Sequence, residues 1–206
     1  VFFAKLAVRY GADACSDMVG RLRLTDPVVL FQGDSDAVVG KACRIPVLTP
    51  GSDAAIAQFG IGQGDLLVTP LHMALMTGVV AAGGMRYAPT LVPRPEAVEG
   101  VRVFSVGVAR ALRTLMRETV VAGTARRANV VGLTVCGKTG TAQAPGGKDH
   151  SWFVCFAPAD SPRIVVTVLV EQGGYGARTA LPIAVELLVL AKQLGLLAGG
   201  ATGGGG

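Results

Sequence analysis

The feature that most constrains the fold is a change in hydrophobic period late in the chain. Three short runs there, 130–136, 151–156 and 164–170, are rich in β-branched and aromatic residues, which is typical of strands. Turn-forming residues at 145–147 and 158–162 separate the runs. Three successive strands with short connections predict an antiparallel meander. The run at 164–170 is apolar on both faces, so we expect it to be the central strand, covered on both sides.

Helical signals precede these strands. No charged side chain occurs at 66–85, but Thr69 and Pro70 mark a helix start there and Gly83–Gly84 marks a helix end. The helix between them has about 13 residues, which is too few to cross a bilayer. We therefore expect a buried core helix.

Two further helices complete the predicted elements. At 105–123, apolar residues recur at helical spacing, with Ser105 placed to cap the start and Gly123 to take a left-handed conformation after the end. A last helix is expected at about 179–194, and the glycine-rich residues 199–206 are expected to be a disordered tail. Helices, then a meander, then a helix make an α+β fold.

Composition excludes several classes of protein. Half of the 206 residues are hydrophobic, and 19 basic and 14 acidic side chains give a formal net charge of +5, so the chain is not intrinsically disordered. The basic residues are scattered rather than clustered, which argues against nucleic-acid binding. The four cysteines and two histidines match no zinc-site spacing, and no metal is expected.

The cysteines are expected to be free thiols. Cys136 and Cys155 are the one pair to consider as a disulfide, because they fall on neighbouring predicted strands. A turn at 145–148 would place them diagonally on one face of the sheet. Their Cβ atoms would then be roughly 7 Å apart, whereas a disulfide needs less than about 4.5 Å.

The stretch 132–139 has two interpretations. It satisfies the pattern Gly-x-x-x-x-Gly-Lys-Thr of a phosphate-binding loop, and Glu171 after an apolar run mimics a magnesium-binding strand end. A phosphate loop also needs a helix that starts at its lysine. The residues after Lys138 include Gly140 and Pro145 and cannot form one. We therefore place Lys138 on a strand and keep nucleotide binding as the less favoured alternative.

On a strand, the Lys-Thr-Gly-Thr-Ala of 138–142 resembles the third sequence motif of penicillin-binding proteins. Other stretches resemble the same family, and one of them, 61–71, is typical of its class B, monofunctional members. These stretches are found at 61–71, 121–125, 150–153, 156–158 and 171–176. The resemblance extends over about 1–194, and the agreement of several spaced motifs makes it specific.

The resemblance implies a fold, an activity and a set of site residues. The fold is an antiparallel sheet flanked by helices on both faces, and the activity is that of a peptidoglycan D,D-transpeptidase, which forms an acyl-serine intermediate and binds penicillin. Lys138 would bind the carboxylate of a D-alanyl-D-alanine stem peptide or of a β-lactam, with the hydroxyls of Thr139 and Thr141 donating to the same group. Gly140 would let an extended peptide approach the strand edge, and the Thr141 N–H would form half of an oxyanion hole. No cofactor is implied.

The chain lacks two motifs of this family. No serine is followed three residues later by a lysine, and Asn129 forms no Ser-x-Asn, so the nucleophilic serine, its lysine and the second motif are absent from this chain. In the family, a stretch like 1–6 comes directly after the second motif. We therefore expect 1–198 to be the C-terminal portion of the transpeptidase domain of a longer protein, here called the parent protein. The chain alone would be inactive.

Several expectations depend on the resemblance alone. An N-terminal helix would anchor the parent protein in the bacterial plasma membrane, with this domain outside the cytoplasm. Its ligands would be peptidoglycan stem peptides and β-lactams, and a membrane glycosyltransferase would be its partner. The alternative is a non-catalytic module that binds peptidoglycan peptides or β-lactams without turning them over.

Overall fold

The fold is known from a computed structural model, in which the chain divides into two compact units. The first unit consists of Val1–Met76 and Met85–Val103, and the second consists of Thr77–Gly84 and Phe104–Gly206. The structure describes residues 1–33, 36–93, 98–144 and 146–198. The expected disordered tail at 199–206 and Pro145 of the predicted turn therefore lie outside the described residues.

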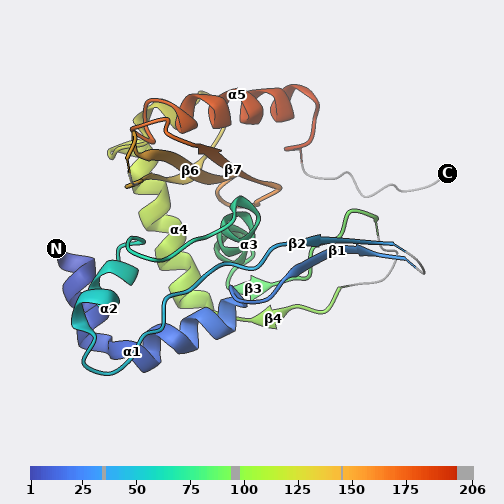
Figure 1. The fold of residues 1–206 in the computed structure, drawn as a ribbon. Coiled ribbons are helices and arrows are strands. Elements are labelled where there is room, and N and C mark those ends of the chain that lie inside the picture. Colours follow the sequence, from blue (N-terminus) through green and yellow to red (C-terminus); the bar gives the residue numbers. More distant parts are fainter. Residues whose placement is uncertain (34–35, 94–97, 145, 199–206) are drawn as a thin grey trace. The chain divides into compact units, whose positions relative to one another are not determined.

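The first unit has a small core beside an interrupted helix. Its elements are α1 (Phe2–Leu22), β1 (Val28–Gln32), β2 (Ala37–Gly40), α2 (Asp53–Phe59), the start of α3 (Pro70–Ala81), β3 (Met85–Arg86) and β4 (Val101–Arg102) (Figure 1). Gly11 interrupts α1 with a φ of 84°, a left-handed value that glycine adopts at low cost. Val19, Leu24 and Cys43 are the buried residues of the core. The strands form two antiparallel pairs, β1 with β2 and β3 with β4.

Helix α3 begins where the sequence predicts. The hydroxyl of Thr69 accepts a hydrogen bond from the His72 N–H at 3.1 Å, and Pro70 is the first helical residue. Gly83 and Gly84 follow the helix with φ values of 65° and 94°. Among the described residues, no helix is both long enough and apolar enough to span a membrane.

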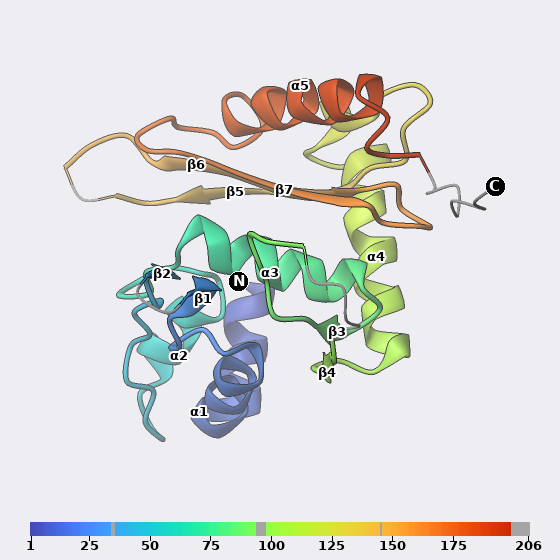
Figure 2. The ribbon, with the colours of Figure 1, turned by 90° about the vertical axis from the view of Figure 1, so that its right-hand side faces the viewer.

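The second unit contains a three-stranded sheet and two long helices. Its elements after the end of α3 are α4 (Val106–Val121), the 3-10 turn η1 (Arg126–Ala128), β5 (Cys136–Ala142), β6 (His150–Ala157), β7 (Ile164–Val170) and α5 (Ala180–Gln193). The strands are antiparallel in the order β5-β6-β7, so the predicted meander is confirmed. Figure 2 shows α5 lying along one side of this sheet. The predicted α+β class is confirmed as well.

Two predictions for this unit were wrong, one on the start of a strand and one on the conformation of a glycine. The first strand was expected at 130–136, but β5 begins only at Cys136, because Gly132 has a φ of 71° in a turn where the Leu133 N–H bonds the Val130 carbonyl. Gly123 does not take the left-handed conformation expected after α4. It is nevertheless a close-packed position, since a Cβ there would lie 2.7 Å from the Cα of Thr119.

The expectation that 164–170 is the central strand was also wrong. In the described part of the chain, β6 lies in the middle and β7 pairs only with β6. The other half of that expectation, that the strand is covered on both faces, is confirmed. Val166 and Val168 pack into the core cluster that includes α5, while Val165 packs against a second cluster on the opposite face.

The register of the sheet divides its side chains between two faces. Gly137 pairs with Cys155, and Cys136 pairs with Phe156. We call the face that packs on α5 the α5 face and the opposite one the α4 face. The α5 face carries Thr139, Thr141, Ser151, Phe153, Cys155, Val166 and Val168, and the α4 face carries Cys136, Lys138, Gly140, Trp152, Val154, Phe156 and Val165.

This register corrects the argument about the cysteines but keeps its conclusion. Cys136 and Cys155 were expected to lie diagonally on one face. They lie on opposite faces, because the pairing differs by one residue from the register assumed from the sequence, and one residue reverses the direction of a strand side chain. All four cysteines are free thiols, as predicted.

Candidate active site

The predicted site residues lie in succession on β5, at the outer side of the described sheet. Lys138 and Gly140 lie on the α4 face, and Thr139 and Thr141 lie on the α5 face. The structure therefore brings the four residues together on one strand but directs their side chains to two sides of it.

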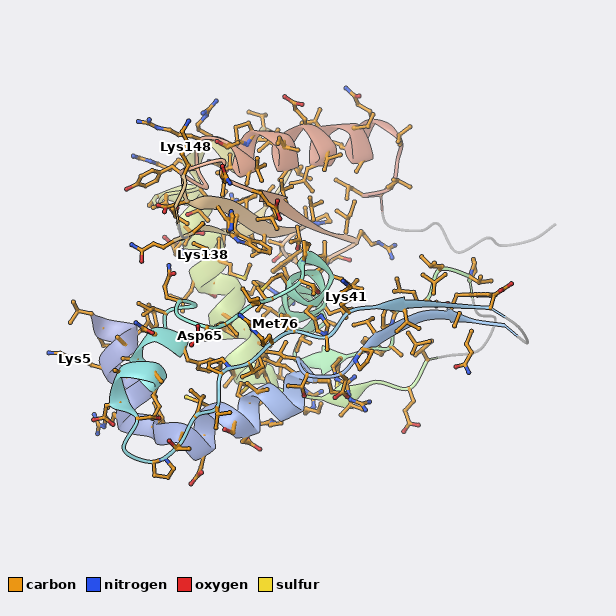
Figure 3. The ribbon with its side chains drawn as sticks, in the orientation of Figure 1. Lys5, Lys41, Asp65, Met76, Lys138 and Lys148 are labelled. Atoms are coloured by element: carbon orange, nitrogen blue, oxygen red, sulfur yellow. The ribbon has the colours of Figure 1, made fainter. Side chains whose placement is uncertain are left out.

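Lys138 is the cation of this group. Its side chain is exposed and extends away from the ribbon of the sheet (Figure 3). Its Nζ donates a hydrogen bond to the Thr139 carbonyl at 2.8 Å. An ammonium group has three N–H donors, and this bond to its own strand uses one of them. The geometry suits a cation that receives an anionic ligand from solvent.

Both threonine hydroxyls have partners within the protein. The Oγ1 atoms of Thr139 and Thr124 are 2.7 Å apart, and the Oγ1 of Thr141 accepts a bond from the Gly176 N–H at 3.4 Å. Sequence reasoning did not single out Thr124 as a site residue. Its only signal was the stretch 121–125, which was noted for its resemblance to the family.

The loop between β7 and α5 packs closely on β5 and β6. A Cβ at Gly176 would lie 2.4 Å from the Gly140 carbonyl oxygen and 2.5 Å from that of Trp152, so only glycine allows this approach. The buried Ser151 hydroxyl links β6 to this loop and to the start of α5. It donates to the Tyr175 carbonyl at 3.2 Å and accepts from the Ala180 N–H at 3.0 Å. The loop thereby supports the backbone of the candidate site.

Other chemistries suggested by the sequence find no support. Strand β5 stays extended from Cys136 to Ala142, so no helix starts at Lys138 as a phosphate-binding loop requires. Over the described ranges, no three His, Cys, Asp or Glu side chains are grouped so that they could hold a metal ion.

Comparison with known proteins gives one consistent family. The family model "Penicillin binding protein transpeptidase domain" matches residues 1–189. The peptidoglycan D,D-transpeptidase PbpA of Mycobacterium tuberculosis is 31% identical over 215 aligned positions, which cover 93% of this chain and 41% of that protein. The peptidoglycan D,D-transpeptidase MrdA of Haemophilus influenzae is 32% identical over 63% of this chain and 24% of its own length.

Solved structures agree with the sequence relatives. The structure of penicillin-binding protein A from M. tuberculosis as a ceftriaxone acyl-enzyme complex superposes with a TM-score of 0.78 at 28% identity, covering 92% of this chain and 45% of that one. The chain thus spans less than half the length of these relatives.

Proposed function

The chain belongs to the penicillin-binding protein transpeptidase family, and from this premise we propose that its parent protein is a peptidoglycan D,D-transpeptidase. The parent would form an acyl-serine intermediate from one stem peptide and transfer the acyl group to an amine of another. Two relatives are named peptidoglycan D,D-transpeptidases, and the M. tuberculosis structure is described as an acyl-enzyme complex. The chain would contribute one wall of the active site.

The observation that carries this proposal is the exposed Lys138 beside Gly140 on an outer strand of the sheet. The ammonium group would bind the terminal carboxylate of a D-alanyl-D-alanine stem peptide, or the carboxylate of a β-lactam. A charge-assisted hydrogen bond of this kind contributes about 1.5–3 kcal/mol. Gly140 has no Cβ, which would let an extended peptide approach the strand and hydrogen-bond its backbone.

The other two residues would act on the same ligand. The Thr139 and Thr141 side chains lie on the other face of β5 from Lys138, and their hydroxyls would donate to the same carboxylate across the outer edge of the strand. The Thr141 N–H would supply half of an oxyanion hole for the tetrahedral intermediate. In comparable hydrolases, one such donor lowers the activation free energy by ~3–4 kcal/mol. The nucleophilic serine and its lysine, which this sequence lacks, would come from another part of the parent protein.

The cellular setting is part of the same proposal. A transpeptidase of peptidoglycan would work outside the cytoplasm, and we propose that a helix elsewhere in the parent protein anchors it to the plasma membrane. A membrane glycosyltransferase would supply the glycan strands whose peptides are cross-linked. The names of the relatives support peptidoglycan as the substrate, and the anchor and the glycosyltransferase are what membership of the family leads us to expect.

Covalent labelling by a fluorescent penicillin tests the proposed function. The parent protein should form a stable adduct on a serine, and the 206-residue chain alone should form none, because the proposed nucleophile is absent from it. A parent protein that binds penicillin reversibly without an adduct would be the non-catalytic module instead. An adduct on the isolated chain would mean that the nucleophile has been misplaced.

A further inference from the structure

Helix α4 passes across the outer side of β5 from one face of the sheet to the other. Leu112 and Met116, in its middle, pack against the cluster that contains Cys136 on the α4 face. Val120, near its end, and Ala125, just beyond it, belong to the cluster on the α5 face. The last turn of α4 and the loop after it therefore lie beside the strand that carries the candidate site.

Two threonine hydroxyls connect this region to β5. The hydroxyl of Thr119 lies within hydrogen-bonding distance of two carbonyls, that of Met116 at 2.8 Å in its own helix and that of Gly137, one residue before Lys138. The hydroxyl of Thr124 lies 2.7 Å from that of Thr139, one residue after it. Both bonds are made by side chains that are distant from β5 in sequence, and together they bracket Lys138.

The loop that presents Thr124 is tightly built. The Gly123 N–H bonds the Glu118 carbonyl at 3.1 Å, and the Ala125 N–H bonds the Thr119 carbonyl at 2.9 Å. A Cβ at Gly123 would lie 2.7 Å from the Thr119 Cα and 2.9 Å from its carbonyl oxygen. Ala125, the next residue after Thr124, has no exposed surface. Thr124 is thus an exposed hydroxyl on a firmly held backbone.

We propose that Thr124 is a positioning residue, whose hydroxyl orients that of Thr139 toward the carboxylate of the bound stem peptide or β-lactam. This inference depends on the proposed function. A hydroxyl has one hydrogen to donate and can accept two. When Thr124 donates to Thr139, the Thr139 hydrogen is left for the ligand. An apolar side chain in place of Thr124 would remove this constraint and let the Thr139 hydroxyl rotate.

Acylation kinetics of the parent protein test the proposal, with penicillin G and its methyl ester as paired probes. Thr124→Val should slow acylation by penicillin G by about two- to twelvefold, the effect of losing one ordinary hydrogen bond. The same variant should slow acylation by the ester much less, because the ester has no carboxylate for Thr139 to meet. Thr124→Ser keeps the hydroxyl and should restore the rate to within about twofold of the wild type. A purely structural role for Thr124 would slow both probes equally.

Thr114 provides the matched control. It is an exposed threonine on α4 whose hydroxyl donates to the Arg110 carbonyl of its own helix, so Thr114→Val should leave both rates unchanged. If the wild type is acylated and Thr124→Val reacts as fast with penicillin G, or loses rate equally with both probes, Thr124 has no positioning role. If the wild-type parent forms no adduct, the proposed function fails, and the role of Thr124 fails with it.

Discussion

The two faces of the β5-β6-β7 sheet differ in how completely they are covered. On the α5 face, Phe153 and Cys155 have no exposed surface, and Val166 and Val168 are 8% exposed. On the α4 face, Cys136 and Phe156 are equally buried, but Lys138 on the same face is exposed. Alternation along a strand thus lets the sheet build its main core on the α5 face and present a charged group at one end of the α4 face. Substitutions on the two faces should therefore have different consequences.

The largest expected effect is a loss of stability on the α5 face. Val168→Asp would bury a carboxylate among apolar side chains with no partner, and should lower the unfolding free energy of the parent domain by about 4 kcal/mol or more. Chemical denaturation followed by circular dichroism measures this. Val131, which is 94% exposed, is the matched control, and Val131→Asp should change stability by less than about 0.5 kcal/mol. Equal, small effects of the two substitutions would contradict the assignment of the α5 face as the core.

The next largest effect is expected from a substitution on the α4 face, and it concerns the rate of acylation. In the parent protein, Lys138→Ala should slow acylation by a penicillin by roughly tenfold to over a hundredfold, because the proposed charge-assisted bond to the carboxylate would be lost. Stability should change by less than about 0.5 kcal/mol, since the side chain is exposed. Stopped-flow kinetics with a fluorescent penicillin, together with thermal unfolding, separate the two quantities.

Two variants sharpen this second test. Lys138→Arg keeps the charge but changes its reach and geometry, so its rate should fall between those of the wild type and Lys138→Ala. Lys148 is another exposed lysine, in the connection between β5 and β6, and Lys148→Ala should react at the wild-type rate. An unchanged rate in Lys138→Ala would remove Lys138 from the site.

The sequence was sufficient to predict elements whose signals are local. The cap at Thr69, the cap at Ser105, whose hydroxyl accepts from the Val108 N–H at 3.2 Å, and the strand at 164–170 were all recognisable because each depends on a few adjacent residues. The same holds for the placement of Lys138 on a strand, which followed from the residues after it that cannot form a helix.

Features that depend on distant residues could not be predicted. The apolar composition of β7 reports that both of its faces are covered, but the order of strands is decided by which strands pair. The register of β5 and β6 depends on which residues form the turn between them. Shifting the pairing by one residue moves every side chain of a strand to the opposite face of the sheet. The contact of Thr124 with Thr139 joins a helix end to a strand, and no local pattern indicates it.

The smallest expected effect concerns the cysteines on the two faces, and it appears only at alkaline pH. Burial raises the pKa of Cys136 to about 11 and that of Cys155 to about 12, from an ordinary value of 9.0. At neutral pH both thiols are protonated in the folded and unfolded states alike, so they give stability no pH dependence. Above pH 9 the unfolded chain loses these protons first, so the unfolding free energy should fall as pH rises toward 11 and 12.

Thiol labelling and alkaline unfolding test this together. At neutral pH without reductant, a thiol reagent should leave Cys136 and Cys155 unmodified in the folded parent protein and should label both once denaturant is added, because neither is in a disulfide. On raising the pH, Cys136 should react before Cys155, since its pKa is the lower of the two. A variant with alanine at both positions should lose less stability between pH 9 and 11 than the wild type. If both thiols stayed unreactive in denaturant until reductant was added, a disulfide would join them, and their assignment to opposite faces of the sheet would be wrong.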